Sequence, residues 1–320
     1  MKLVFFGTGE FGLPTLKAIH AHPEFELCGI VTGPDKPQGR GRKIAPTPIA
    51  EWAAAQSFQP VWKPARLNDP AFAAQLRDVA AGVFVVVAYR ILPETVFTLA
   101  DYAFNLHASL LPAYRGAAPI QRAIMAGETS TGVTTFLLQK TVDTGGILMQ
   151  KETAIDPSEN AGVLAERLSV LGADVVMETL RRLSLGDVRP QTQNNSRASA
   201  APKITPADRI LHFEEPGATS VNRVRGLAPA PGAVAVFRQR LVKILAMSNA
   251  GALTETAIAG EVLEANPKSR LVIAGGDCGL EVKLIQPEGK APQTGAEFVR
   301  GYRVTKGERF ETANLVELRG

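Results

Sequence analysis

The sequence predicts an α/β domain with an open, mostly parallel, Rossmann-like sheet, followed by a smaller, OB-like β-barrel. Three observations support this. The first half alternates short, uniformly apolar runs with helix-like segments, as strands buried on both faces of a parallel sheet require. Residues 188–207 are rich in Pro, Gln, Asn and Ser, as in a linker. Five closely spaced apolar runs follow, which indicates a barrel. We therefore predict domains at 1–187 and 208–320.

The elements of the first domain follow from its apolar runs in chain order. The expected strands are LVFF, LCGIVT, VFVVVAY, AFNLH and VTTFLLQ. Helices are expected between them at 14–21, 48–56 and 72–79, and Thr47 as N-cap with Pro48 at the first position defines one start. Apolar residues at helical spacing predict a long helix over 161–185, which ends at Gly186 and closes the domain.

The second domain opens with a short helix, expected over 219–227. Its predicted strands are AVAVF, LVKILA, GEVLEA, RLVIAGG and LEVKLIQPEG, with Gly and Pro between them. Short strands at this spacing favour a closed or curled sheet over a layered α/β arrangement.

Composition limits the class of protein. The chain has 320 residues, of which 45% are hydrophobic and 21% charged, as in an ordinary globular protein. No apolar run reaches the ~18 residues that span a bilayer, and no charged leader precedes the first strand, so we expect a cytoplasmic protein without membrane contact. Cys28 and Cys278 lack ligand spacing, so no structural metal is expected. The net charge of +4 is the sum of −2 in residues 1–180 and +6 in residues 181–320, and the basic second part suggests a polyanionic partner.

An amide and an imidazole stand two residues apart in NLHASLLP, and a carboxylate follows later in VDTGG. If 104–107 form a strand, Asn105 and His107 point to the same face and can hold a carbonyl oxygen as it becomes negative. Asp143 precedes two glycines, which would let backbone approach a ligand closely. These three residues are the candidate catalytic set of an acyl-transfer site, expected at the carboxyl ends of the strands.

Two glycine-rich stretches have competing interpretations. Gly7, Gly9 and Gly12 match a dinucleotide-binding pattern after a strand, but the next strand ends in IVTGP without the acidic residue for a ribose, so a tight strand-to-helix turn is favoured. Residues 33–48 form an unusually long connection. Its four cations can grip phosphates, or simply be solvated; they are Lys36, Arg40, Arg42 and Lys43.

Several motifs together resemble the methionyl-tRNA formyltransferase family: FGTGEF, PDKPQGRGRK, NLHASLLPAYRGAAPIQRAI, VDTGGIL and the later APKI. The resemblance implies formyl transfer from 10-formyltetrahydrofolate to charged initiator methionyl-tRNA in translation initiation, by a monomer without a metal. The SLLP-type loop is shared with the wider group of 10-formyltetrahydrofolate-dependent formyltransferases, so it identifies the chemistry better than the acceptor. The basic loop and the second domain point to tRNA within that group.

The resemblance also carries residue roles. It implies Asn105, His107 and Asp143 as the catalytic triad and Arg40 as the contact to the acceptor end of tRNA. The implied folate-binding residues are Ala88, Tyr89, Arg90, Ile91, Leu92, Ser109, Leu110, Leu111 and Pro112. The loop AYRILP is one residue shorter than usual in the family, Gly9 stands where proline is common, and LAPAPG lacks a frequent tryptophan.

Other readings stay open at this point. A formyltransferase acting on a nucleotide-linked amino sugar or on glycinamide ribonucleotide would carry the same triad, although the purine enzyme would be nearer ~200 residues, about one domain. A nicotinamide-dependent dehydrogenase would explain the first glycines. A non-catalytic RNA-binding protein would explain the basic second half, but not the intact triad.

Overall fold

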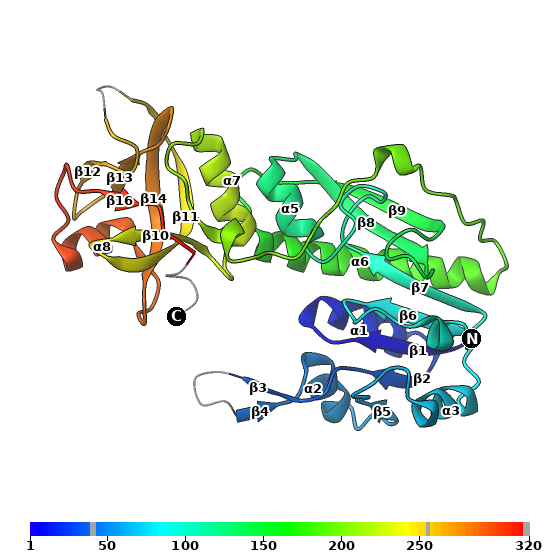
Figure 1. Cartoon of the computed structure of the whole chain (residues 1–320). Coiled ribbons are helices and arrows are strands. Elements are labelled where there is room, and N and C mark those ends of the chain that lie inside the picture. The colour runs from blue at the N-terminus through cyan, green and yellow to red at the C-terminus, as the bar shows by residue number, and fades with distance from the viewer. Residues whose placement is uncertain (39–42, 254–256, 316–320) are drawn as a thin grey trace. The chain divides into compact units, whose positions relative to one another are not determined.

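The computed structural model describes residues 1–38, 43–253 and 257–315, which form two compact units (Figure 1). The first unit contains Met1–Gly116, Ser130–Ala154 and Ala165–Ala201; the second contains Ala117–Thr129, Ile155–Leu164 and everything from Pro202. Two short segments of the first half of the chain thus belong to the second unit. The predicted domain boundaries at 187 and 208 describe which parts of the chain fold independently, and they stay a prediction.

The first unit is built on a seven-stranded sheet with the order β5-β2-β1-β6-β7-β8-β9. The first five strands of this order, β5 to β7, are parallel, whereas β8 pairs antiparallel with both of its neighbours, β7 and β9. The predicted open, mostly parallel sheet is therefore confirmed. Its strands are β1 (Lys2–Gly7), β2 (Glu26–Val31), β5 (Val61–Trp62), β6 (Val83–Val87), β7 (Tyr102–His107), β8 (Ser130–Leu137) and β9 (Ile147–Ala154).

Helices cover both faces of this sheet because the central strands β1 and β6 carry apolar residues on both faces. Val4 and Phe6 of β1 share a core with Phe72 and Leu76, while Leu3 and Phe5 are fully buried on the opposite face. The helical elements are η1 (Glu10–Gly12), α1 (Leu13–Ala21), α2 (Pro48–Ala55), α3 (Pro70–Asp78), α4 (Glu94–Phe97), α6 (Ala161–Ser184) and the short η2 (Asn195–Arg197).

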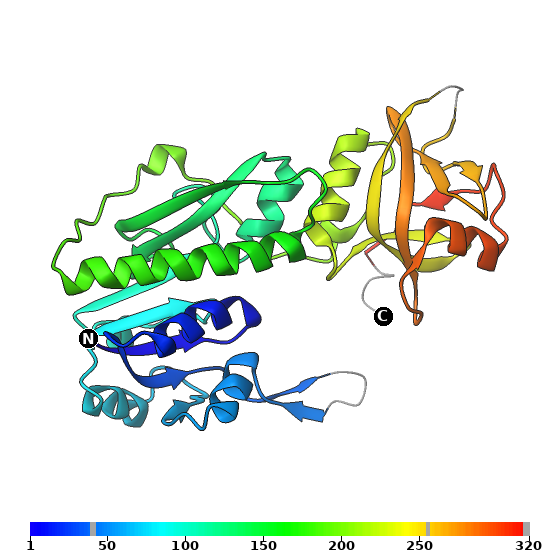
Figure 2. The same ribbon diagram turned by 180° about the vertical axis from the view of Figure 1, so that it is seen from behind.

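The long helix α6 crosses the strands at the antiparallel edge (Figure 2). The hydroxyls of Thr179 on α6 and Thr135 on β8 lie 2.8 Å apart. Gly172 faces β7 so closely that a Cβ there would lie 2.5 Å from Cδ2 of Leu106. Gly186 follows the helix with a φ of +68°, so the predicted helix and its glycine stop are confirmed.

The turn after β1 is a packing feature. A Cβ at Gly7 would lie 2.6 Å from the Phe5 ring and 3.2 Å from the carbonyl oxygen of Val87 on β6. The chain then enters η1 and α1 directly, as the tight-turn interpretation expects. At the start of α2, the Ala50 amide donates to the Thr47 hydroxyl at 3.1 Å, which confirms the predicted N-cap.

The connection over 33–48 contains a small antiparallel ribbon. Strands β3 (Lys36–Gln38) and β4 (Lys43–Ala45) pair with Gln38 opposite Lys43. Between β2 and α2 the chain is therefore an extended ribbon (Figure 1). Thr32 and Thr47, at the base of this connection, join through their hydroxyls at 2.7 Å.

The second unit is a curled antiparallel sheet with the order β12-β13-β14-β11-β10-β16. The Val262 amide donates to the Glu308 carbonyl at 2.7 Å and the Phe310 amide to the Gly260 carbonyl at 2.8 Å, which joins the two ends of this order into a barrel. The five predicted strands are confirmed. The strands are β10 (Ala233–Phe237), β11 (Arg240–Ala252), β12 (Val262–Ala265), β13 (Leu271–Ala274), β14 (Cys278–Pro287), β15 (Gln293–Thr294) and β16 (Phe310–Glu311).

Three helices and one 3-10 turn complete the second unit: α5 (Pro119–Ala126), η3 (Ala207–Arg209), α7 (Gly217–Leu227) and α8 (Gly295–Tyr302). Helix α7 confirms the expected helix over 219–227 and packs on α5, since a Cβ at Gly226 would lie 2.9 Å from the Gln121 carbonyl oxygen. Helix α8 was not predicted. It begins at a capping box in which Thr294 accepts from the Glu297 amide and Glu297 accepts from the Thr294 amide.

Candidate active site

The end of β7 carries the predicted amide and imidazole. Residues Asn105 and His107 both lie within this strand, so their side chains project to the same face, as the sequence predicts. His107 is almost fully buried, with 6% of its side chain exposed, and Asn105 is partly buried. Leu106 pairs with Val87, the last residue of β6, which places the loop after β6 beside His107.

One nitrogen of the His107 ring is held by the loop that follows β7. Its Nε2 lies 2.8 Å from the carbonyl oxygen of Tyr114. Because a carbonyl oxygen only accepts hydrogen bonds, Nε2 must carry a proton. The ring is therefore fixed in orientation, and Nδ1 is the nitrogen available for chemistry. Tyr114 has a φ of +60°, an uncommon left-handed conformation for a side-chain-bearing residue.

The Asp143 carboxylate faces that second nitrogen. Its Oδ2 lies 3.8 Å from Nδ1 of His107, too far for a hydrogen bond but within ion-pair range, and the carboxylate side chain is 10% exposed. The Gly116 amide donates to the same Oδ2 at 2.8 Å. When the imidazole is doubly protonated, this carboxylate stabilises its charge in a largely water-excluded place. The structure thus brings His107 and Asp143 together beside Asn105.

The route by which Asp143 reaches His107 differs from the prediction. We expected it just beyond the carboxyl end of a parallel strand, next to His107. Strand β8 is antiparallel, and the Leu138 amide donates to the carbonyl of Ala103 near the start of β7. The loop from β8 to β9 therefore begins at the opposite end of β7 and must return along the strand to place its carboxylate.

The two glycines after Thr144 serve this loop itself. A Cβ on Gly145 would collide with the carbonyl oxygen of Leu137, and a Cβ on Gly146 would lie 2.8 Å from Cβ of Pro190. Both glycines allow close packing of the loop against protein. The packing of the loop alone therefore accounts for both glycines, and their predicted role of letting backbone approach a ligand stays a prediction. Asp143 itself takes a left-handed φ of +55°.

The first predicted folate segment, 88–92, follows β6. Ala88 is exposed with a φ of +48°, and the side chain of Ile91 is 72% exposed, whereas Leu92 is buried in the core. Arg90 donates to the carbonyl of Pro64 at 2.7 Å and to the Tyr89 hydroxyl at 3.0 Å. Burial raises the pKa of the Tyr89 hydroxyl, while the Arg90 hydrogen bond acts in the opposite direction. Arg90 thus braces the loop, and Ile91 is its exposed apolar group.

The second predicted folate segment, 109–112, follows β7 and is internally bonded. Ser109 is fully buried and donates to the Ala113 carbonyl at 2.6 Å. The Thr134 hydroxyl donates to the Ser109 carbonyl and accepts from the Leu111 amide. Leu110 and Pro112 are partly buried, and Leu111 is buried. The polar groups of this loop are thus used to hold its shape beside His107.

The predicted tRNA contacts are placed only in part. Lys36 is exposed on β3, and Lys43 begins β4. Arg40 and Arg42 lie outside the residues that the structure describes. The basic loop therefore remains a prediction from the sequence.

Sequence reasoning missed two side chains near Asp143. Gln193 is buried and donates to the Asp143 carbonyl at 2.9 Å, and Arg115 donates to Gln193. Gln193 stands in the polar stretch 188–207, whose composition suggests a linker. The structure assigns residues as far as Ala201 to the first unit. No feature of the amino-acid sequence in this stretch distinguishes the buried Gln193 from its exposed neighbours.

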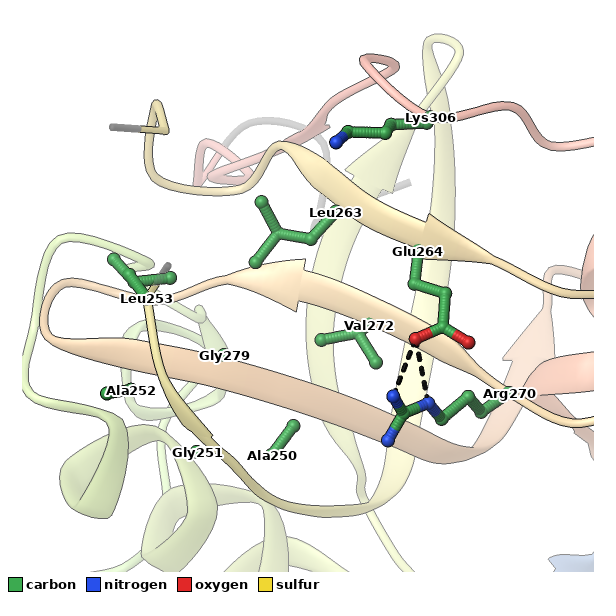
Figure 3. A pocket seen from close by; sticks show the side chains of 10 residues that line it. All are labelled: Ala250, Gly251, Ala252, Leu253, Leu263, Glu264, Arg270, Val272, Gly279 and Lys306. Atoms are coloured by element: carbon green, nitrogen blue, oxygen red, sulfur yellow. Dashed lines mark hydrogen bonds and ion pairs between the residues drawn. The ribbon is translucent and has the colours of Figure 1, made fainter. Parts of the chain in front are cut away.

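A separate cavity of about 310 Å³ lies on the barrel (Figure 3). Its charged wall is a pair in which Arg270 donates to the Glu264 carboxylate at 2.8 Å, so these two groups neutralise each other. No predicted site residue is among the ten that line it: Ala250, Gly251, Ala252, Leu253, Leu263, Glu264, Arg270, Val272, Gly279 and Lys306. We assign it no function.

The described ranges hold neither a cluster of metal ligands nor a membrane-spanning helix. Residues 1–38, 43–253 and 257–315 contain no group of three or more His, Cys, Asp or Glu side chains able to hold a metal ion. Among the helices of these same residues, none is long and apolar enough to cross a bilayer.

Similarity to known proteins covers both units. Residues 1–180 match the formyl transferase family and residues 203–303 match the formyl transferase C-terminal domain. The methionyl-tRNA formyltransferase of Chlorobium chlorochromatii (strain CaD3) is 44% identical over 308 residues, covering 95% of this chain and 98% of the relative. That of Solibacter usitatus (strain Ellin6076) is 40% identical over 317 residues, covering 98% of this chain and 100% of the relative.

Solved structures share the fold. HypX from Aquifex aeolicus in complex with tetrahydrofolic acid matches with a TM-score of 0.65 and 16% identity over 98% of this chain, which spans 51% of HypX. The N-formyltransferase from Helicobacter canadensis, in complex with folinic acid and dTDP-3-aminofucose, matches with a TM-score of 0.64 and 17% identity over 90% of this chain and 99% of its own. With full-length relatives at 40% identity or more and both domain families matched, the chain belongs to the methionyl-tRNA formyltransferase family.

Proposed function

We propose that this chain transfers the formyl group of 10-formyltetrahydrofolate to the α-amino group of initiator methionyl-tRNA. The observation that carries the proposal is the buried His107–Asp143 pair beside Asn105, in a member of this family. In this pair the Asp143 carboxylate can stabilise a protonated His107, whose positive charge can in turn stabilise the negative oxygen that forms during acyl transfer. Two relatives that match over nearly the whole chain bear the name of this activity.

The reaction requires stabilisation of a tetrahedral intermediate. The α-amino nitrogen attacks the formyl carbon, a carbon–nitrogen bond forms, and the carbonyl oxygen becomes negative. In this mechanism, the Asn105 amide and the Nδ1–H of the His107 imidazolium donate to that oxygen. The Tyr114 carbonyl fixes the ring through Nε2, so Nδ1 is pre-aimed and little reorganisation is needed. Loss of one such donor typically costs about 3 kcal/mol in the barrier.

The proposed role of Asp143 is electrostatic and protonic. The attacking amine must lose a proton, and N10 of the folate must gain one as its bond to the formyl carbon breaks. A carboxylate 3.8 Å from Nδ1 stabilises the imidazolium and lies close enough to relay a proton between the two nitrogens through water or the ring. Breakdown of the intermediate then releases tetrahydrofolate and the formylated ester.

The folate site is proposed at the loops after β6 and β7. Pairing of Val87 with Leu106 places residues 88–92 beside His107, and Ile91 offers an exposed apolar side chain for a flat ring. The loop 109–112 provides a wall whose shape is fixed by Thr134. In the shortened AYRILP loop, Arg90 donates to the Pro64 carbonyl and to the Tyr89 hydroxyl. We therefore propose that Arg90 supports the conformation of residues 88–92.

The tRNA contact is proposed for the basic loop, Lys36, Arg40, Arg42 and Lys43. Cations that neutralise phosphates release counterions, so binding should weaken steeply as salt rises. The substitution Arg40→Ala should weaken binding of methionyl-tRNA more than binding of folate. Equal tRNA affinity at low and high salt would count against this role. A monomeric state and a cytoplasmic location are also proposed from the sequence.

One assay tests the function. Purified protein is offered 10-formyltetrahydrofolate with initiator methionyl-tRNA, glycinamide ribonucleotide or a nucleotide-linked amino sugar, each in a separate reaction. We expect formyl transfer to methionyl-tRNA alone, and no binding of NADH at the turn after β1. Formylation of the amino sugar in preference to methionyl-tRNA would overturn the proposed acceptor, and no transfer to any amine would overturn the reaction.

A further inference from the structure

Gln193 is a buried polar side chain in a stretch that otherwise faces solvent. It is 6% exposed, whereas Gln191, Thr192, Asn194 and Asn195 are exposed. A buried amide is costly unless its groups are hydrogen-bonded, so its burial calls for partners.

All four hydrogen-bonding positions of this amide are used. Its Nε2 donates to the carbonyl oxygens of Asp143 at 2.9 Å and Gly145 at 2.8 Å. Its Oε1 accepts from Nε of Arg115 at 3.1 Å and from Nη2 at 2.6 Å. The carbonyls can only accept and the guanidinium can only donate, so the orientation of the amide is determined by chemistry.

The two carbonyls that Gln193 holds bracket the turn that presents the Asp143 side chain. Asp143 adopts a left-handed φ of +55°, which is uncommon for a residue other than glycine, so hydrogen bonds from outside the turn help to hold it. The Gly116 amide fixes the carboxylate from the other side, through Oδ2. Gln193 therefore fixes the backbone of Asp143 and Gly116 its side chain, and together they set the 3.8 Å distance to His107.

We propose that Gln193 is a positioning residue for formyl transfer, which acts only through Asp143, and that Arg115 orients its amide. The role rests on the function proposed above. The structure also explains why the segment returns to the first unit after β9 and α6. The Gln191 and Ile147 backbones exchange hydrogen bonds in both directions at 2.8 Å, which anchors the segment two residues before Gln193.

The test is a double-mutant cycle measured by steady-state formylation of methionyl-tRNA, with kcat and KM determined for each variant. Gln193→Glu is nearly isosteric and keeps the acceptors for Arg115, but it cannot donate to the two carbonyls, so it separates positioning from folding. We expect kcat to fall roughly ten- to a hundredfold with the KM of both substrates within about twofold, since a displacement of ~1 Å has effects of this size. Gln193→Ala should behave alike if it folds.

The second arm places the same change in the Asp143→Ala background, where we expect less than about a twofold further loss, since coupled residues are strongly non-additive. Asn195→Ala is the matched control, because it removes another hydrogen bond to Arg115, of 2.9 Å, without touching the Asp143 loop. Its kcat should stay within about twofold of the parent, as for ordinary surface changes.

Three results would overturn the role. Normal kcat in Gln193→Glu would show that the two carbonyls need no donor, and an equally large loss in the Asp143→Ala background would show that Gln193 acts elsewhere. A wild-type chain that transfers no formyl group would overturn the proposed function and this role with it. An active wild type with an unaffected Gln193→Glu overturns the role of Gln193 alone.

Discussion

The charge on Asp143 is the most testable part of the site, because Asp143→Asn removes it while keeping the shape of the side chain. The Asn amide can still accept from Gly116 at the place of Oδ2, so the loop should keep its conformation. What is lost is the attraction to a protonated His107. Two unit charges 3.8 Å apart interact by about 4 kcal/mol at the effective dielectric of ~20 that suits such sites.

This energy sets the expected kinetic effect. At about 1.4 kcal/mol for each factor of ten, the whole attraction corresponds to roughly a thousandfold, and residual solvent makes a hundred- to thousandfold loss of kcat the expected range. In the proposed mechanism the carboxylate stabilises the imidazolium during transfer and does not contact the tRNA, so the KM for methionyl-tRNA should change little.

The assay is the initial rate of formyl incorporation into methionyl-tRNA, with thermal unfolding followed on the same samples. Asp187→Asn, which removes an exposed carboxylate from the same unit, is the control and should leave kcat unchanged. If Asp143→Asn kept a third or more of the wild-type kcat with an unchanged Tm, the electrostatic reasoning would be refuted.

Three further outcomes follow from the same structure. Asn105→Ala should lower kcat by about a hundredfold or more with normal folding, measured in the formylation assay; a loss under tenfold would argue against an oxyanion contact. Gly145→Ala should lower both Tm and kcat because its methyl would strike the Leu137 carbonyl, whereas Gly9→Ala, with nothing within 4 Å of the new methyl, should change neither. Hydrogen bonds from Arg122 lower the pKa of Asp208 from 3.8 to about 2, so Asp208→Asn should reduce the free energy of unfolding by about 2 kcal/mol at pH 7. A lowered carboxyl pKa stabilises fully above the unfolded pKa, and the stabilisation is lost as pH falls through the folded pKa, so that difference should shrink as pH falls from about 4 towards 2. Urea unfolding that shows the same difference at pH 7 and pH 3 would contradict it.

Much of the fold can be predicted from local patterns in the sequence. The apolar runs of the first half and the short strands of the second are stretches of neighbouring residues, the long helix over 161–185 follows a period of 3.6, and the same-face placement of Asn105 and His107 follows a period of two; the structure has them all. The Thr47 cap and the stop at Gly186 are equally local. Helix α8 was missed although its capping box is readable in TGAE, because its eight residues follow a short strand without a strong apolar run.

The features that sequence could not supply are those set by pairing at a distance. A fully buried run such as that in β8 fits a parallel or an antiparallel neighbour equally well, so the direction of β8 and the return path of the Asp143 loop were out of reach. The contact of Gln193 with Asp143 spans 50 residues and joins a polar stretch to a turn. Such a contact leaves no period in the chain.

The proposed role of the His107 ring, which is held through Nε2 and faces Asp143, is to stabilise the developing negative oxygen during formyl transfer. It is tested most directly by single-turnover formylation of methionyl-tRNA with saturating His107→Gln enzyme and 10-formyltetrahydrofolate. We expect a transfer rate at least about a hundredfold below that of the wild type, with both substrates still bound. A rate within threefold of the wild type would contradict it.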